Sequence, residues 1–309
     1  MGKFVPISVV IPTMNRPETL ERTLSTYAAG EMLPEQIIIV DQTEDENKKH
    51  VVQQISRKYG CDYLYLREPS LTAARNIGRQ AANYEIIVFS DDDIDVYDDT
   101  MKCIFEIMRL QDIALIAGID DLTGASKTNI GYILGTKSYK KRNIGHVTKS
   151  ILGRYPDHVT GEIQTEWAMG YFFAVRKSCI NKWNLSWDER LISYAYAEDL
   201  DYTYRYCKKA KQEGLKCILT DKVHVKHLAS KEYRVPSRKS TFMYAIHRRY
   251  IADKNHMGSR AAIAWCDFWR IVERVIKHEH PDELISAIRK AAELRRNSYV
   301  GMEEAIRKV

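Results

Sequence analysis

Residues 85–95 read EIIVFSDDDID, a strand-like run followed by a cluster of acids. The mostly apolar residues 86–90 predict a buried strand, and the carboxylates of Asp91, Asp92 and Asp93 follow it directly. Like charges crowded at one strand end are costly unless a cation neutralises them. A divalent metal carrying a diphosphate would do so, because Mg²⁺ and Mn²⁺ prefer oxygen ligands and often share them with substrate phosphates. The alternative is a solvated acidic turn.

The composition is ordinary for a globular protein, with 45% hydrophobic and 28% charged residues among 309, enough for one large domain or a domain with a smaller lobe. The net charge of +6 suits a phosphate-bearing or anionic-surface partner, and no nucleic acid is expected. Six scattered cysteines indicate reduced thiols in the cytosol. No stretch reaches the roughly 18–20 apolar residues of a transmembrane helix. We therefore expect a cytoplasmic protein, or one peripheral on the cytoplasmic face of a membrane.

Short, largely apolar runs alternate with helical patterns in the first third of the chain, and the run at 7–11 is rich in β-branched residues. Strands are predicted over 7–11, 36–40, 63–66 and 86–90, with helices between them. This order predicts a parallel sheet flanked by helices, whose strands end at one ligand-binding edge. We expect that edge to collect the 12–15 loop, Asp41, segment 67–75 and the acids after residue 90. No GxGxxG or GxxxxGK[ST] motif is present, which disfavours dehydrogenases and P-loop enzymes.

Six segments occur in a recognisable order: SVVIPTMNRPETLERTL, IIIVDQT, SLTAARNIG, IIVFSDDDID, GYFFAVRKS and AEDLDYTYRY. Over roughly residues 5–230 the chain resembles the inverting family 2 glycosyltransferases of the GT-A fold, which contain a DxD motif. The resemblance implies an α/β architecture, a Rossmann-like mixed sheet flanked by helices. It also implies a nucleotide-diphosphate sugar as donor and Mn²⁺ or Mg²⁺ as cofactor.

The resemblance also suggests roles for individual residues on the donor side. The positions implied to lie along the nucleotide base and ribose are Pro12, Thr13, Asn15 and Asp41. Arg75 would face the base or the diphosphate, although an ordinary surface ion pair is the alternative. Asp91 and Asp93 match the DxD motif, with Asp93 as the direct metal ligand, and Asp92 could take that role because this copy reads DDD.

Trp167 and Gly170 lie in EWAMGYFFAV (166–175), a strand-like run that the resemblance associates with the donor sugar and the acceptor. An aromatic ring can stack on a sugar, but a Trp in an apolar strand is more often part of the core.

Glu198 and Asp199 open a later helix, where the helix dipole alone would favour carboxylates. An inverting sugar transfer also needs a carboxylate to accept the proton of the attacking hydroxyl. The resemblance assigns this task to the pair, with Asp199 as base and Glu198 orienting the acceptor.

His224 and His227 follow a predicted strand, 216–220, and their odd spacing would put them on opposite faces of a strand. Both therefore cannot bind one metal unless the segment is irregular. GT-A proteins often end the catalytic region with a histidine that touches metal or diphosphate, which makes His227 a candidate metal ligand. A structural or surface histidine is the alternative.

From Thr241 onward the chain is predicted to be helical, and apolar residues of 262–276 recur at helical spacing between basic ones. This helix could rest on an anionic membrane, or dock on its own domain or on a partner in a homo-oligomer. We expect a GT-A catalytic domain over 1–240, with a nucleotide-binding half over about 1–118 and an acceptor-binding half over about 119–240. Residues 241–309 would be a helical extension.

The sequence thus predicts a metal-dependent inverting glycosyltransferase. The acceptor would be a hydroxyl of a carbohydrate or a lipid-linked saccharide, in surface polysaccharide or glycolipid synthesis. A sugar-phosphate nucleotidyltransferase and a non-catalytic nucleotide-sugar binding module are the rival interpretations.

Overall fold

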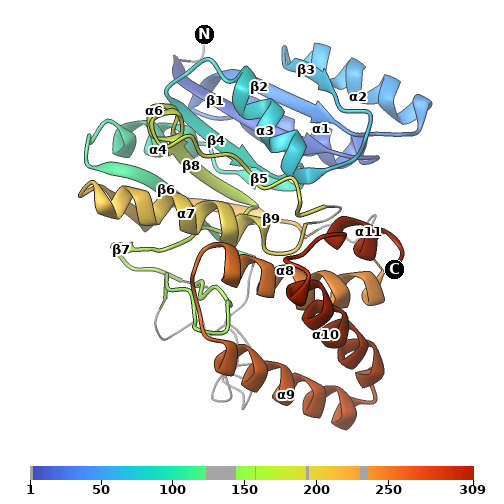
Figure 1. Ribbon diagram of the computed structural model, residues 1–309. Helices are drawn as coiled ribbons and strands as arrows, with labels where there is room; N and C mark the ends of the chain where they lie inside the picture. Colours follow the sequence, from blue (N-terminus) through green and yellow to red (C-terminus); the bar gives the residue numbers. More distant parts are fainter. Residues whose placement is uncertain (1–2, 123–143, 157, 193–194, 230–235) are drawn as a thin grey trace.

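A computed structural model describes the chain except for residues 1–2, 123–143, 157, 193–194 and 230–235. Its strands are β1 (Lys3–Thr13), β2 (Met32–Asp41), β3 (Asp62–Tyr65), β4 (Ile86–Ser90), β5 (Ile94–Val96), β6 (Ile113–Asp120), β7 (Glu162–Gln164), β8 (Phe172–Arg176) and β9 (Lys216–His227). They form one sheet in the order β3-β2-β1-β4-β8-β6-β9-β5, and β7 pairs with β9 (Figure 1).

The first half of the sheet is parallel, as the βα alternation predicts. β1 lies between β2 and β4, and β3 extends the sheet beyond β2, all in parallel register. The connections are α1 (Pro17–Ala28), α2 (Glu46–Lys58) and α3 (Leu71–Ala81). α3 packs closely on β1 because Gly78 has no side chain: an added Cβ would lie 2.2 Å from Cγ1 of Val10. The carboxyl ends of β1, β2 and β4 therefore meet at one edge.

The second half makes the sheet mixed. β8 runs antiparallel between β4 and β6, while β6 and β9 are parallel. The predicted strand 166–175 is wrong in its first half, since β8 begins only at Phe172. The backbone of Gly170 instead bonds to side chains: its N–H donates to Asp199 and its carbonyl accepts from Arg75. β9 continues past the predicted end at residue 220, because its second half pairs with β5.

The remaining helices are α4 (Thr100–Met108), α6 (Lys177–Lys182), α7 (Glu198–Gln212), α8 (Ser237–Lys254), α9 (Arg260–Lys277), α10 (Pro281–Arg296) and α11 (Met302–Arg307). α8 has eleven buried residues and carries α10 and α11 on its surface, while α9 lies at the far end of the molecule (Figure 1). Among the described residues, none of the helices has both the length and the apolarity to cross a bilayer. The basic run 137–142 of the predicted acceptor-binding half lies outside the described residues.

Candidate active site

An acidic group with one histidine lies at the carboxyl end of β4. Ligand atoms of Asp91, Asp93 and His227 all lie within 4.8 Å of one another. The sheet brings His227 there, because β5 pairs with β9 and puts Ile94 opposite His227. Nε2 of His227 is 3.4 Å from Oδ1 of Asp93, whereas Nδ1 of His224 bonds to Asp121 at 2.8 Å. The two histidines thus have different surroundings, as expected from their odd spacing.

The surroundings of His227 favour a cation at this position. Burial lowers the pKa of His227, but the carboxylates of Asp93, Asp91 and Asp120 outweigh burial and raise it. Burial raises the pKa of Asp91, and Asp93 adds to this effect. Carboxylate oxygens suit Mn²⁺ and Mg²⁺, and imidazole is a common metal ligand. The donor set therefore fits a divalent cation, and the Asp91 side chain, 31% exposed, keeps one side open to a diphosphate.

Asp92 points into a different environment and does not belong to this group. Its Oδ2 accepts a hydrogen bond from Oγ1 of Thr13 at 2.6 Å, and its Oδ1 is paired with Arg16. Its backbone oxygen accepts from Oγ1 of Thr23 at 2.7 Å. Burial raises the pKa of Asp92 to about 7, although Arg16 and Thr13 lower it. Asp92 thereby ties the end of β4 to the end of β1 and to α1.

Arg75 connects the acidic group to the second pair of carboxylates. It is 1% exposed, which excludes the surface ion pair considered above. Nη1 donates to Oε1 of Glu198 at 2.7 Å, and Nη2 donates to Oδ1 of Asp91 at 3.0 Å. The guanidinium also lies over the ring of Trp187, 4.6 Å from its centroid. A buried charge is tolerated only when it is paired in this way.

Glu198 and Asp199 open α7 beside this arginine. Burial and the neighbouring Asp199 raise the pKa of Glu198 to about 8, against the lowering effect of Arg75. Asp199 is half-buried; its Oδ2 accepts from the Gly170 N–H at 2.9 Å and its Oδ1 from the Leu200 N–H at 2.7 Å. Burial raises the pKa of Asp199 despite these bonds. The two carboxylates thus differ in exposure and in partners.

The predicted donor-side residues lie at the ends of β1 and β2, where Pro12 pairs with Val40. Asp41 is fully buried; its Oδ1 accepts from the Thr43 N–H and its Oδ2 from the Tyr63 hydroxyl, at 2.9 and 2.8 Å. Asn15 has a φ of 60°, and its buried Oδ1 lacks a hydrogen-bond partner among the described residues. An unpaired buried acceptor is costly, so Asn15 is suited to a ligand donor.

Trp167 lies in the core and is only 4% exposed. Its Nε1 donates to the carbonyl of Arg154 at 3.3 Å, and its ring packs edge-on against Tyr155. A Cβ at Gly153 would lie 2.1 Å from the same ring. Little of the indole is left for a sugar to stack on, which favours the core interpretation.

Residues 8–178 match the sequence profile described as glycosyl transferase family 2, more than half of the chain. The chain belongs to this family.

Two curated relatives and one solved structure show how far the similarity extends. The chain is 28% identical over 97 residues to a chondroitin synthase of Pasteurella multocida (strain Pm70), which is 30% of this chain and 10% of the relative. It is 26% identical over 105 residues to GalNAc(5)-diNAcBac-PP-undecaprenol β-1,3-glucosyltransferase of Campylobacter jejuni, 32% of this chain and 33% of the relative. The chain therefore matches a third or less of the length of these relatives.

The mannosyltransferase PcManGT from Pyrobaculum calidifontis, solved with GDP-Man and Mn²⁺, resembles this glycosyltransferase in fold. The TM-score is 0.55 at 12% identity, over 98% of this chain and 82% of that one. The mixed sheet with flanking helices is accordingly the GT-A fold, followed by a helical C-terminal region.

Sequence reasoning missed several residues that shape the candidate site. Arg16 precedes α1 and pairs with Asp92, and its Nη1 lies 3.7 Å from Oδ2 of Asp93. Its position was a usable signal, since a cation at a helix N-terminus is unfavourable without an anionic partner. Tyr171 stacks on His227 with ring centroids 5.0 Å apart. No sequence pattern announces that contact, because β8 and β9 are far apart in the chain.

Proposed function

We propose that this glycosyltransferase transfers a sugar from a nucleotide-diphosphate sugar to a hydroxyl acceptor, with inversion and with a divalent cation. One observation carries the proposal: Arg75 donates hydrogen bonds both to Asp91, in the acidic group with Asp93 and His227, and to Glu198. It also donates to the carbonyl of Gly170, whose N–H donates to Asp199. One arginine side chain therefore links the candidate metal-diphosphate site to the start of the helix that carries the proposed proton acceptor.

Asp93, Asp91 and His227 would hold Mn²⁺ or Mg²⁺, and the Mn²⁺ in the similar mannosyltransferase structure supports the first. The cation would offset the charge that develops on the leaving diphosphate. Arg16 adds a fixed positive charge beside Asp93. Asp92 would act indirectly, by holding Arg16 and Thr13 in place.

Asp199 would be the base. As the acceptor oxygen bonds to the anomeric carbon and the carbon–oxygen bond to the diphosphate breaks, Asp199 takes the hydroxyl proton. Two backbone N–H groups fix its carboxylate, and its partial exposure leaves it accessible to an acceptor. Glu198, held by Arg75, would orient the acceptor. Gly170 would serve by its backbone, which contacts both Asp199 and Arg75.

The nucleotide would lie over the ends of β1 and β2, along Pro12, Thr13, Asn15 and Asp41. The unpartnered Oδ1 of Asn15 supports this placement, since an N–H of the base or a ribose hydroxyl could satisfy it. Asp41 would shape the site rather than bind the nucleotide directly, because both of its carboxylate oxygens already accept hydrogen bonds from the protein.

The acceptor would be a carbohydrate or a lipid-linked saccharide, in surface polysaccharide or glycolipid synthesis. The names of the two relatives, a chondroitin synthase and a transferase acting on an undecaprenyl-diphosphate-linked saccharide, support this class. Residues 1–240 would form the catalytic domain and 241–309 the extension. The protein would act in the cytoplasm or at the cytoplasmic face of a membrane, which the extension would contact.

A panel of UDP-, GDP- and dTDP-sugars, assayed with and without Mn²⁺, tests the proposal. We expect metal-dependent release of nucleoside diphosphate from at least one donor, its loss in Asp93→Asn, and its retention in the matched variant of exposed Asp98, Asp98→Asn. Pyrophosphate release with nucleotide incorporation would instead indicate a nucleotidyltransferase. Metal-dependent donor binding without any turnover would indicate a binding module.

A further inference from the structure

Helix α9 (Arg260–Lys277) buries Ile263 and Cys266 but exposes four large apolar side chains to solvent. Trp265, Phe268, Val275 and Ile276 are 54%, 54%, 54% and 73% exposed. They are separated by three, seven and one residues, which places all four within about 100° of one another around the helix. Monomeric proteins seldom expose large apolar side chains in a contiguous stripe without an interaction partner.

The opposite face of α9 is anchored by polar side chains. Asp267, 2% exposed, accepts from Nη1 of Arg248 at 3.1 Å and from Nη2 of Arg249 at 2.6 Å. Nη2 of Arg274 donates to Oγ1 of Thr241 at 2.8 Å, and Arg270 lies 4.1 Å from the ring centroid of Tyr244. These directional contacts fix the rotation of the helix about its axis and hold the apolar face toward solvent.

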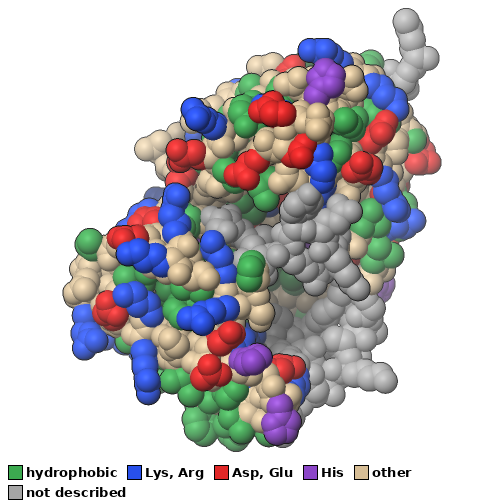
Figure 2. All heavy atoms as spheres, turned by 90° about the vertical axis from the view of Figure 1, so that its right-hand side faces the viewer, with side chains coloured by type: hydrophobic (Ala, Val, Ile, Leu, Met, Phe, Trp, Pro, Cys, Tyr) green, Lys and Arg blue, Asp and Glu red, His purple; other side chains and the backbone are tan. Residues whose placement is uncertain are grey.

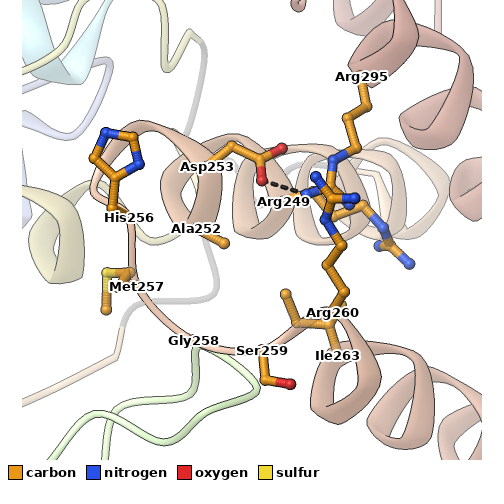
Figure 3. Close-up of a pocket in the computed structure, with 10 residues that line it drawn as sticks. All are labelled: Arg249, Ala252, Asp253, His256, Met257, Gly258, Ser259, Arg260, Ile263 and Arg295. Atoms are coloured by element: carbon orange, nitrogen blue, oxygen red, sulfur yellow. Dashed lines mark hydrogen bonds and ion pairs between the residues drawn. The ribbon is translucent and has the colours of Figure 1, made fainter.

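A basic pocket lies beside the N-terminal end of α9. A cavity of about 200 Å³ between α8, α9 and α10 is lined by Arg249, Arg260 and Arg295 together with Ser259 (Figure 3). Arg295 is paired with Asp253 and Arg249 with Asp267. Arg260 is exposed and has no ion-pair or hydrogen-bond partner among the residues the structure describes.

The surrounding surface has the sign that an anionic partner requires. Residues 241–309 contain thirteen Lys and Arg against nine Asp and Glu. Figure 2 shows hydrophobic side chains gathered at the lower end of the molecule, where Figure 1 places α9. Asp, Glu and His side chains border them in this view, and Lys and Arg are spread over the surface above. An apolar stripe with Trp and Phe beside basic residues is the pattern of a helix lying in a membrane interface.

We propose that the α9 face, defined as Trp265, Phe268, Val275 and Ile276, docks on the surface of an anionic phospholipid bilayer, and that Arg260 with the pocket beside it receives a headgroup phosphate. The apolar side chains would enter the headgroup–acyl boundary, and the cations would meet the lipid phosphates. This gives the membrane contact in the proposed function a defined surface. It does not depend on catalysis, since the helix needs neither donor nor acceptor to bind lipid.

Vesicle co-sedimentation of the full chain, without any sugar, tests this directly. We expect binding to vesicles of equal parts phosphatidylglycerol and phosphatidylcholine, weakening with salt, and little binding to phosphatidylcholine alone. Ile276→Glu and Phe268→Glu should each weaken binding roughly tenfold, because burial of one such side chain is lost. The matched variant Val300→Glu, at a 75% exposed valine outside α9, should bind like the wild type.

Separate variants test the proposed contact between Arg260 and a headgroup phosphate. Arg260→Gln should weaken binding several-fold, whereas Arg57→Gln, at an exposed arginine of α2, should not. Inorganic phosphate added as a competitor should not displace the protein from vesicles beyond its effect as salt. Displacement by phosphate alone would mean that the pocket takes a free anion, and it would overturn this part.

Wild-type measurements keep the proposal testable if a variant fails to fold. Transfer of Trp265 into lipid should shift the tryptophan fluorescence to shorter wavelength on addition of anionic vesicles, and Trp265→Phe should remove most of the shift. Absence of both binding and shift in the wild type would overturn the proposal. A concentration-dependent dimer that Ile276→Glu dissociates, without lipid binding, would assign the face to a second copy. Sugar transfer to a soluble acceptor should be unchanged in Ile276→Glu, which separates this test from that of the proposed function.

Discussion

Nη1 of Arg75 lies 2.7 Å from Oε1 of Glu198, and both side chains are buried although 123 residues separate them in the chain. The same guanidinium reaches Asp91, so one arginine from α3 fixes the relative position of β4 and α7. Its network is therefore part of the folding energetics as well as part of the candidate site.

Removing this arginine should cost stability as well as activity. Arg75→Met leaves buried carboxylates without their cation, and we expect the free energy of unfolding in urea to fall by about 3–5 kcal/mol. The double variant Arg75→Met/Glu198→Gln should recover part of that loss, because the unpaired charge is also removed. If the free energy of unfolding falls in the double variant by the sum of the two single losses, the two residues are not coupled, which would contradict this prediction.

Asp199→Asn should separate chemistry from donor binding. The amide keeps the size of the side chain but cannot accept the proton, so we expect kcat to fall by about 10²–10⁴. The Kd for the metal–nucleotide sugar should remain nearly that of the wild type, because Asp199 is not in the group of Asp91, Asp93 and His227. Calorimetry and turnover assays measure the two quantities. A large loss of donor affinity would count against Asp199 as base.

The single methyl group that Gly170→Ala adds should impair sugar transfer. The added Cβ would lie 3.0 Å from both Nη2 of Arg75 and Cβ of Asp199, so one of them must shift. A misplacement of about 1 Å can lower turnover by about 10², so a shift of a few tenths of an ångström should lower it by less than that. Gly78→Ala is the contrasting variant: its Cβ would meet Val10 at 2.2 Å, and we expect a lower melting temperature instead. Wild-type turnover in Gly170→Ala would exclude the tight contact.

His247 should make stability depend on pH. Burial lowers its pKa from 6.5 to about 4, so the folded chain keeps the ring neutral while the unfolded chain takes up a proton below pH 6.5. The neutral ring therefore contributes about 3 kcal/mol to the free energy of unfolding. This contribution is complete above pH 6.5 and is lost as the pH falls toward 4. When the pH is lowered from 7 to 5, the free energy of unfolding in urea should fall by about 2 kcal/mol less in His247→Gln than in the wild type. His50→Gln, at an exposed histidine, should keep the wild-type dependence.

Local patterns in the sequence determined the parallel half of the fold. A five-residue, mostly apolar run before DDD, three more short apolar runs and the helices between them predict the order of β1 to β4, because side-chain period and loop chemistry are local properties. Parallel strands then bring Asn15, Asp41 and Asp91 to one edge. The period of two along a strand separated His224 from His227.

Only the tertiary structure decided which way particular side chains face. Asp92 turns to Thr13 and Arg16, Trp167 packs into the core, and Arg75 pairs with a glutamate from a distant helix. The periodicity of α9 defines an apolar stripe but cannot say whether that stripe faces the domain or solvent. That choice depends on Asp267 and its two arginine partners, whose contacts bring together helices that no local pattern relates.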